Sequence, residues 1–195
     1  MNQQVATLPT RLNLGCGSFK KPGFLNVDIV PEVEPDLILD LDSLPYPFPD
    51  NHFELIEAFH VLEHLRDPFQ AIAEMYRIAK PGAQIHIRVP HFSRGFTHPD
   101  HKHGFGVNFP TYYANPSAGP YRGVHLKLLK MRLRWLGQPY LKKSTLSKPL
   151  FLTASAIGGV IDFFANLSPY LASRLWCYWV GGFEEIEYRF QVIKP

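Results

Sequence analysis

The chain has 195 residues, of which 46% are hydrophobic and 19% are charged, and its formal net charge is +3. This size and composition predict one globular domain with an ample core, and the small charge does not by itself indicate a nucleic-acid-binding protein. The two cysteines lie far apart and do not indicate a disulfide framework. Because the first residues also lack a signal-peptide pattern, we expect a cytoplasmic protein.

The first half of the chain alternates short apolar runs with turns. Runs at 11–14, 24–27, 37–39 and 53–59 predict buried parallel strands. Asp67 is expected to cap a helix with Pro68 at its first position, and Pro81-Gly82 is expected to end that helix. Alternation over 84–89 predicts a fifth strand. This order is typical of an α/β fold built on a parallel sheet.

The second half has a different character. Residues 91–120 are rich in His, Pro, Gly and aromatic residues, which predicts a long loop with a functional role. Apolar residues occupy alternate positions over 124–128 and again, shifted by one residue, over 129–135. The shift at 128/129 predicts one strand with a β-bulge. Residues 148–180 have helical character broken at Ser168-Pro169, and 186–192 read as the last strand. The apolar run 150–167 contains Asp162, Asn166 and two glycines, so we do not expect it to be a transmembrane helix.

The chain is organised around the segment Leu12-Asn13-Leu14-Gly15-Cys16-Gly17, which is followed by a second strand that ends at Asp28. Glycines let a backbone turn approach a ligand closely, and an acid at the end of the second strand can accept hydrogen bonds from ribose hydroxyls. The dinucleotide pattern G-x-G-x-x-G is not complete, because Lys20 stands where its third glycine would be. A nucleoside ligand without a pyrophosphate fits this segment better.

Six motifs occur in order between Arg11 and about Pro90: Leu-Asn-Leu-Gly-Cys-Gly, Asn-Val-Asp, Leu39 to Pro45, Phe48 to Glu54, His60-Val61-Leu62-Glu63-His64-Leu65, and Lys80-Pro81-Gly82. This set resembles the class I S-adenosylmethionine-dependent methyltransferases, specifically the type 11-like members with a shortened first helix. The resemblance implies a Rossmann-like α/β fold with a mostly parallel seven-stranded sheet, an antiparallel last strand, and an inserted loop and helical region after the fifth strand. It also implies one domain over 1–195, with a cofactor-binding half at 1–90, a substrate-recognition region at 91–182 and the last strand at 183–195.

The resemblance makes S-adenosylmethionine the expected cofactor. Gly15, Cys16 and Gly17 would approach it through their backbone, and Asp28 would hold its ribose. The same resemblance places Asp40 and Leu41 beside the adenine and His60 near the methionine end. The alternative is that the glycines form only a tight turn and that Asp28 only caps a strand.

The loop after the fifth strand is the expected source of a catalytic base, because ligands of open α/β sheets bind at the carboxyl ends of the strands. His101, with Asp100 beside it, is our choice, and His91 is a further candidate. His98, Asp100, His101 and His103 are also metal-ligand types, but successive residues of an extended loop point apart, so we expect no metal.

Transfer to an oxygen or nitrogen of a small or saccharide-like acceptor is the function we expect, without nucleic acid as a partner. The alternative is a non-catalytic cofactor-binding or membrane-peripheral protein. Basic residues that alternate over 125–134, followed by Lys142-Lys143, read first as a solvated strand face. They leave open a weak contact with a membrane surface, helped by the apolar 150–167 run. The sequence gives no oligomeric state.

Overall fold

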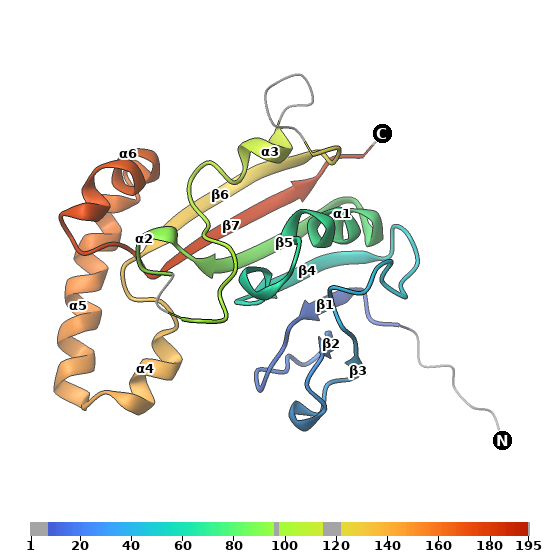
Figure 1. Ribbon diagram of the computed structural model, residues 1–195, viewed down its shortest axis with the longest axis horizontal. Helices are drawn as coiled ribbons and strands as arrows, with labels where there is room; N and C mark the ends of the chain where they lie inside the picture. The colour runs from blue at the N-terminus through green and yellow to red at the C-terminus, as the bar shows by residue number, and fades with distance from the viewer. Residues whose placement is uncertain (1–7, 96–97, 115–121, 195) are drawn as a thin grey trace.

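One seven-stranded sheet organises the computed structural model, which describes residues 8–95, 98–114 and 122–194 (Figure 1). The strand order is β3-β2-β1-β4-β5-β7-β6. The strands are β1 (Arg11–Leu14), β2 (Leu25–Asp28), β3 (Leu37–Ile38), β4 (Phe53–Phe59), β5 (Ala79–Pro90), β6 (Leu126–Arg134) and β7 (Glu185–Val192). Only β7 runs antiparallel to its neighbours, β5 and β6. The expected sheet and its antiparallel last strand are confirmed. The expectation about a signal peptide at the N-terminus, and part of the predicted 91–120 loop, lie outside the described residues.

Helix α1 (Pro68–Ile78) begins where the sequence predicts. The Asp67 carboxylate accepts hydrogen bonds from the backbone N–H groups of Phe69 and Gln70 at 2.9 and 3.3 Å. The expectation that Pro81-Gly82 ends this helix is wrong, because the helix already ends at Ile78. Ala79 is fully buried and pairs with Phe53 in the sheet, so the chain must leave the helix before it reaches the proline.

Apolar side chains of the sheet point toward α1 and α3 (Thr111–Ala114), which lie on the same face in Figure 1. In α1 the buried residues recur at helical spacing, and the strands supply alternate positions such as Ile85, Ile87 and Val89. Tyr113 of α3 is also fully buried among them. The core therefore lies on one side of the sheet.

The opposite face of the central strands carries charge. Glu57 of β4 contacts Lys21 and lies 3.5 Å from the ring of His86, and Glu187 of β7 pairs with three arginines. These arginines are Arg88, Arg134 and Arg189. The basic residues of β6 continue this face, and the predicted β-bulge is confirmed by a register shift between Leu128 and Lys130. The alternating basic residues thus belong to an ion-paired sheet face.

A helical insertion separates β6 from β7. It contains α4 (Pro139–Thr145), α5 (Lys148–Ala165), α6 (Pro169–Arg174) and the short 3-10 helix η3 (Trp176–Tyr178). The predicted break at Ser168-Pro169 is confirmed, whereas α4 was not predicted. Helix α5 is held against β6 by Asp162 and Asn166, whose side chains bind the backbone of Trp135 and Leu133.

Helix α5 is long and apolar enough to cross a membrane, with a mean hydropathy of 1.3 over 18 residues. We expected a helix here but not a transmembrane one, and α5 meets the criterion by length and composition alone. Only 11% of this segment is buried, so α5 is not a core helix of the described structure.

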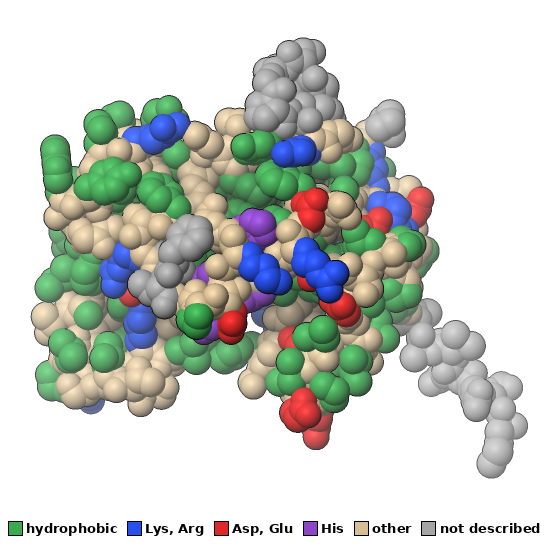
Figure 2. All heavy atoms as spheres, in the orientation of Figure 1, with side chains coloured by type: hydrophobic (Ala, Val, Ile, Leu, Met, Phe, Trp, Pro, Cys, Tyr) green, Lys and Arg blue, Asp and Glu red, His purple; other side chains and the backbone are tan. Residues whose placement is uncertain are grey.

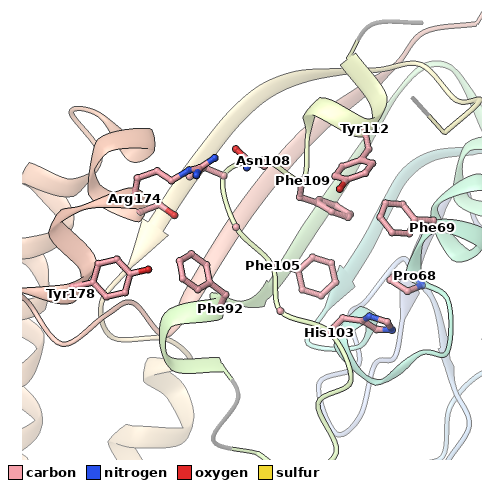
Figure 3. Close-up of a pocket in the computed structure, with 14 residues that line it drawn as sticks. Pro68, Phe69, Phe92, His103, Phe105, Asn108, Phe109, Tyr112, Arg174 and Tyr178 are labelled. Atoms are coloured by element: carbon pink, nitrogen blue, oxygen red, sulfur yellow. The ribbon is translucent and has the colours of Figure 1, made fainter. Parts of the chain in front are cut away.

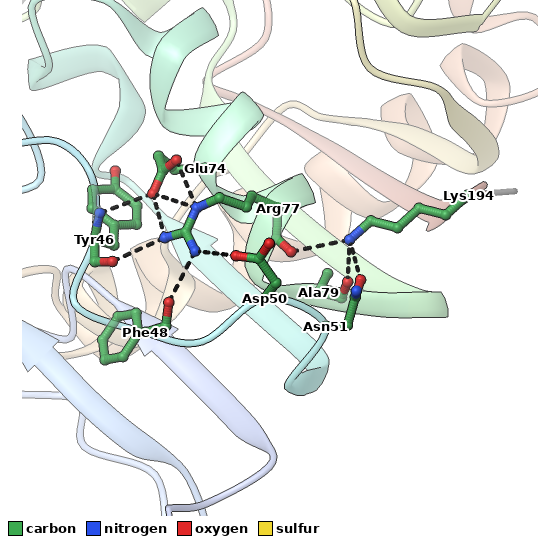
Figure 4. A network of polar contacts seen from close by, with 8 residues as sticks. All are labelled: Tyr46, Phe48, Asp50, Asn51, Glu74, Arg77, Ala79 and Lys194. Atoms are coloured by element: carbon green, nitrogen blue, oxygen red, sulfur yellow. Dashed lines mark hydrogen bonds and ion pairs between the residues drawn. The ribbon is translucent and has the colours of Figure 1, made fainter.

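The segment between β3 and β4 has no helix and is fixed by side chains instead (Figure 4). The Arg77 guanidinium donates to the carbonyls of Tyr46 and Phe48 at 2.9 and 3.0 Å and pairs with Asp50 at 2.6 Å. Glu74, one turn before Arg77 on α1, accepts from the Tyr46 N–H at 2.8 Å. The C-terminal helical turn of α1 therefore anchors this segment.

Candidate active site

The turn after β1 is shaped by two glycines with left-handed backbone conformations. Gly15 has φ +63° and Gly17 has φ +48°. A Cβ on Gly15 would lie 2.6 Å from the side chain of Val61, so this position also requires close packing. A Cβ on Gly17 would meet nothing within 4 Å. Gly17 therefore opens onto free space, as a backbone that receives a ligand does.

Asp28, at the end of β2, closes the turn. Its Oδ2 accepts a hydrogen bond from the N–H of Gly17 at 2.7 Å, and its Oδ1 accepts one from the N–H of Val30 at 3.0 Å. A carboxylate has about four acceptor positions, so two remain for a ligand. The carboxylate is therefore both oriented by the backbone and able to accept further hydrogen bonds.

The short link between β1 and β2 is held by a buried asparagine instead of a helix. The Asn26 side chain accepts from the Lys21 N–H and donates to the carbonyls of Lys21 and Phe24. It also accepts from the side chain of Asn13 in β1 at 3.0 Å. These bonds satisfy the backbone of a turn that no helix orders, which explains how so short a connection keeps a defined shape.

A cavity of about 370 Å³, the turn cavity, lies beside this turn at the carboxyl ends of β1, β2 and β4. Its volume is within the usual range for small-molecule sites. Of the predicted cofactor residues, six line it: Gly15, Gly17, Asp28, Asp40, Leu41 and His60. Ile29, Leu39, Val61 and Leu65 add apolar wall. A wall of this kind, together with a carboxylate and an open glycine, suits a nucleoside with an attached polar chain.

Cys16 does not line the turn cavity. Its side chain is buried, and burial together with the charge of Asp28 raises the pKa of its thiol. A thiol of this kind is not a nucleophile at neutral pH. Only the backbone of Cys16 belongs to the turn, where its N–H donates to the carbonyl of Val27 at 3.0 Å.

His60 follows β4 with a left-handed backbone, φ +55°. Its Nε2 lies 2.8 Å from Glu185 Oε2, and its Nδ1 lies 3.5 Å from Glu63 Oε1. Burial lowers the pKa of His60, but its hydrogen bond to Glu185 and the nearby negative charge of Glu63 outweigh burial and raise the pKa to about 9. His60 is therefore an imidazolium at neutral pH and is not a base there.

A second cavity of about 600 Å³, the histidine cavity, adjoins the first. The two cavities share His60 and His64 in their walls. The histidine cavity is also lined by His101 and by the charged groups Glu63, Arg94, Lys142 and Glu184. In Figure 2 the histidine side chains gather near the centre of the face shown, beside a hollow.

The other predicted catalytic residues line neither cavity. His91 is fully buried, between the hydroxyls of Ser93 and Ser173 at 2.7 and 2.8 Å, and burial lowers its pKa to about 4. The exposed Asp100 carboxylate lies 4.0 Å from the ring of His98. The structure thus brings His101 to the cavity without His91 or the carboxylate of Asp100.

Several charged groups of the site were not predicted. Glu63 stands within a motif quoted for the resemblance, so a signal for it was present. Glu185 begins β7 and Glu184 directly precedes it, more than 120 residues from His60, and no local pattern marks them. Arg94 follows the fifth strand, and its guanidinium pairs with Glu184 at 2.8 Å.

A third cavity of about 460 Å³ is lined mainly by aromatic side chains, among them Phe69, Phe92 and Tyr112 (Figure 3). It shares no residue with the turn cavity. A group bound there would not share a wall with a ligand at Gly15 and Asp28, so we do not assign it to the same site.

Part of the chain is similar to known methyltransferases. Residues 25–87 match the family model described as "Methyltransferase domain". The chain is 46% identical over 46 residues to ajmaline N-methyltransferase of Rauvolfia serpentina, which covers 24% of this chain and 16% of that protein. It is 38% identical over 55 residues to the ubiquinone/menaquinone biosynthesis C-methyltransferase UbiE of Burkholderia mallei, which covers 28% and 22%. The matches thus span less than a quarter of these relatives.

Solved structures share the fold over nearly the whole chain. A S-adenosylmethionine-dependent methyltransferase of Archaeoglobus fulgidus superposes with a TM-score of 0.52 at 16% identity, covering 93% of this chain and 85% of that one. The [4+2]-cyclase SpnF superposes with a TM-score of 0.55 at 15% identity, covering 95% and 74%. Because a cyclase is among them, the fold alone does not fix the reaction.

Proposed function

We propose that this chain, which carries a domain of the class I S-adenosylmethionine-dependent methyltransferases and takes that cofactor, transfers a methyl group to an oxygen or nitrogen of a small or saccharide-like acceptor. The observation that carries this proposal is the pair of cavities that meet at His60 and His64. Methyl transfer needs a donor and an acceptor held in line at one point. A nucleoside-sized cavity that opens beside a polar one meets that requirement.

In this proposal the cofactor occupies the turn cavity. Asp28 accepts hydrogen bonds from the ribose hydroxyls, and the backbone at Gly15 and Gly17 borders the ribose and methionine parts. Asp40 and Leu41 border the adenine. His60 stands where the two cavities join and borders the methionine part, while its ring nitrogens face Glu185 and Glu63.

S-adenosylmethionine supplies an electrophilic methyl group on a sulfonium sulfur, which keeps the electron pair of the broken bond. The chain's own residues bind the acceptor and move its proton. His101 lines the histidine cavity and is the group we propose to accept the proton from the acceptor oxygen or nitrogen. Arg94, Lys142 and Glu184 present donors and acceptors on the same wall, which suits a hydroxyl-rich molecule. These four polar side chains favour a saccharide-like acceptor over an apolar one.

The test has two steps. Calorimetric titration with S-adenosylhomocysteine establishes cofactor binding, and transfer of labelled methyl groups to a panel of saccharides and amines follows. We expect His101→Asn to keep cofactor affinity within twofold and to lower kcat. His125→Asn, at the opposite end of the sheet, is the control. Binding without transfer to any acceptor would favour the non-catalytic alternative, and no binding would refute the proposal.

A second candidate function, attachment to a membrane surface, is favoured by one observation. Helices α5 and α6 with η3 expose many large apolar side chains: Leu150, Leu152, Ile157, Val160, Phe163, Phe164, Leu167, Tyr170, Leu171, Leu175, Tyr178 and Trp179. We call this set the apolar helical face. Trp179 is 81% exposed and Phe163 is 64% exposed, which is unusual for a protein surrounded only by water.

We propose that the apolar helical face lies on the surface of an anionic bilayer. The exposed Lys143 of α4 and Lys148 at the start of α5 supply positive charge next to it. The polar contacts of Asp162 and Asn166 with β6 support a helix that lies on the membrane rather than one that crosses it. The free, buried Cys16 and Cys177 support a cytoplasmic location.

Sedimentation with liposomes tests this second function. We expect binding to vesicles that contain phosphatidylserine, weaker binding to neutral vesicles, and loss of binding in the double variant Phe163→Ser, Phe164→Ser. Both side chains are exposed, so the variant should keep its melting temperature. The control is Ile38→Ser, which replaces an exposed apolar side chain on β3, outside the apolar helical face. Equal sedimentation of wild type and double variant would contradict the assignment.

A further inference from the structure

We propose that Glu63, His64 and His101 form a binding site for one divalent transition-metal ion of the zinc type. One ligand atom from each residue lies within 4.8 Å of the other two. Ligand atoms of a tetrahedral zinc site, with bonds of about 2.1 Å, are roughly 3.4 Å apart. The two histidine rings are only partly buried, so their rotation can bring the ligand atoms to this shorter separation.

The donor set determines the kind of metal. Two imidazole nitrogens and one carboxylate suit zinc, and the same set also occurs with other first-row divalent ions. Magnesium and calcium prefer oxygen ligands, so two imidazoles disfavour them. Three protein ligands leave a coordination position for a water molecule or for an oxygen of the acceptor.

Glu63 gives an independent reason to expect a cation. Its side chain is 0% exposed, and within the described part of the chain neither carboxylate oxygen has a hydrogen-bond partner. The nearest positive group is the ring of His60, which lies 3.5 Å from Oε1 and is shared with Glu185, to which it lies closer, at 2.8 Å. A buried carboxylate without hydrogen bonds is costly, and a bound cation is one of the few ways to satisfy it.

The ring of His64 is oriented as a metal ligand would be. Its Nδ1 lies 3.3 Å from the backbone carbonyl of Asp100, and its Nε2 lies 4.0 Å from Glu63 Oε1. A proton on Nδ1 that is donated to this carbonyl leaves the lone pair of Nε2 facing Glu63. The 98–103 segment therefore fixes the tautomer as well as supplying the third ligand.

Backbone bonds hold the 98–103 segment against the short 3-10 helix η2 (Leu62–His64), which carries the other two ligands. The Lys102 N–H donates to the carbonyl of Glu63 at 2.8 Å, and Lys102 Nζ donates to that of His64 at 2.7 Å. His103 Nε2 lies 3.0 Å from the carbonyl of Leu65. The three ligands thus come from two segments that are bonded to each other.

This site replaces the ligand set weighed from the sequence. The ring of His103 faces backbone carbonyls, and the ring of His98 stacks on that of His101 with centroids 4.9 Å apart. The Asp100 carboxylate is exposed, and only its backbone carbonyl contacts a ligand. The decisive acid is Glu63, which lies 38 residues before His101 and was not considered as a ligand.

The role of the ion in catalysis rests on the proposed function. His64 lines both cavities, so an ion there stands where the cofactor and the acceptor meet. When the ion is bound, His101 is a ligand and cannot act as the base. The positive charge then lowers the pKa of a bound acceptor hydroxyl, whose O–H bond breaks with release of the proton to water. The oxygen keeps its electron pair for attack on the methyl carbon.

Calorimetry of the chelator-treated protein with ZnCl₂ tests the site directly, and Co²⁺ absorption in the visible range reports the coordination. We expect one zinc ion per chain and at least tenfold weaker binding for Glu63→Gln, His64→Asn and His101→Asn. His125→Asn is the matched control and should bind as the wild type does. Circular dichroism and thermal melting of each variant show that it is folded.

The outcomes separate this inference from the proposed function. The absence of zinc binding, or binding that survives both Glu63→Gln and His101→Asn in folded protein, overturns the metal site. A parallel titration with S-adenosylhomocysteine measures ligand binding in the turn cavity, which His101 does not line. Zinc binding without binding of S-adenosylhomocysteine supports the metal site and contradicts the proposed function.

Discussion

Asp28 is the residue whose substitution tests the turn cavity most directly. Its two carboxylate oxygens hold the N–H groups of Gly17 and Val30 at 2.7 and 3.0 Å. In Asp28→Asn one oxygen becomes an NH₂ group, so one backbone bond is lost and the negative charge disappears. Asp28→Ala removes both bonds and therefore also loosens the turn.

The magnitude follows from the bonds involved. A hydrogen bond to a charged group contributes about 1.5–3 kcal/mol, so loss of one charged ribose contact should weaken binding of S-adenosylhomocysteine roughly 10- to 150-fold. Calorimetric titration measures this change, and Glu54→Gln, at the opposite end of β4, is the control with an equal loss of charge. We expect Glu54→Gln to bind as the wild type does, because Glu54 is exposed and pairs with Lys80.

A second measurement separates binding from folding. Urea denaturation of Asp28→Asn without ligand should show a loss of about 1.5–3 kcal/mol, as expected for one lost hydrogen bond to a charged carboxylate. If Asp28→Asn binds S-adenosylhomocysteine within twofold of the wild type, the carboxylate does not contact the ribose. Asp28 would then be only a cap for the turn, which is the alternative that the sequence left open.

Three further predictions concern stability and are measured by urea denaturation. Gly15→Ala should lose about 2–4 kcal/mol because its Cβ would collide with Val61, whereas Gly17→Ala should lose about 1 kcal/mol from backbone strain alone. Equal losses would contradict the packing argument. The pKa of His60 is raised to about 9, so its stabilisation is complete below pH 6.5 and disappears as the pH rises through 9. His60→Gln should remove this pH dependence of the unfolding free energy, which is worth at most about 3 kcal/mol. If the variant keeps the pH profile of the wild type, the raised pKa of His60 is wrong. Arg77→Met should lose about 2–4 kcal/mol, and Lys80→Met, which breaks an exposed pair, less than about 1 kcal/mol. Similar losses in the two would refute the anchoring role of Arg77.

The strands of the cofactor-binding half could be predicted because each is a short apolar run between strong turn signals. The runs at 11–14 and 53–59 match β1 and β4 at both ends. The end of α1 could not be predicted, because it depends on the pairing of Ala79 with Phe53 across the sheet. Helix α4 was also missed, because it is short and has no buried residue and therefore no apolar periodicity.

The site was predictable to the extent that it is local. Gly15, Gly17 and Asp28 lie within 14 residues of one another and meet through one hydrogen bond. The charge state of His60 depends on Glu185, which is 125 residues away, so no local pattern could reveal it. The same holds for His91, whose burial against Ser173 of α6 removes it from the cavities.

The two departures from a fully helical α/β sandwich have a common physical basis. Where a helix would order the links after β1 and β3, buried or partly buried polar side chains do so, with Asn26 of β2 beside one link and Arg77 of α1 beside the other. The sheet face left without helices is instead covered by paired charges such as Glu57 with Lys21 and Glu187 with Arg88. Because the walls of the turn cavity come from these links, the networks that replace the helices also determine the shape of the cofactor site. Stability and cofactor affinity should therefore respond together when either network is cut, whereas substitutions in the apolar helical face should change neither.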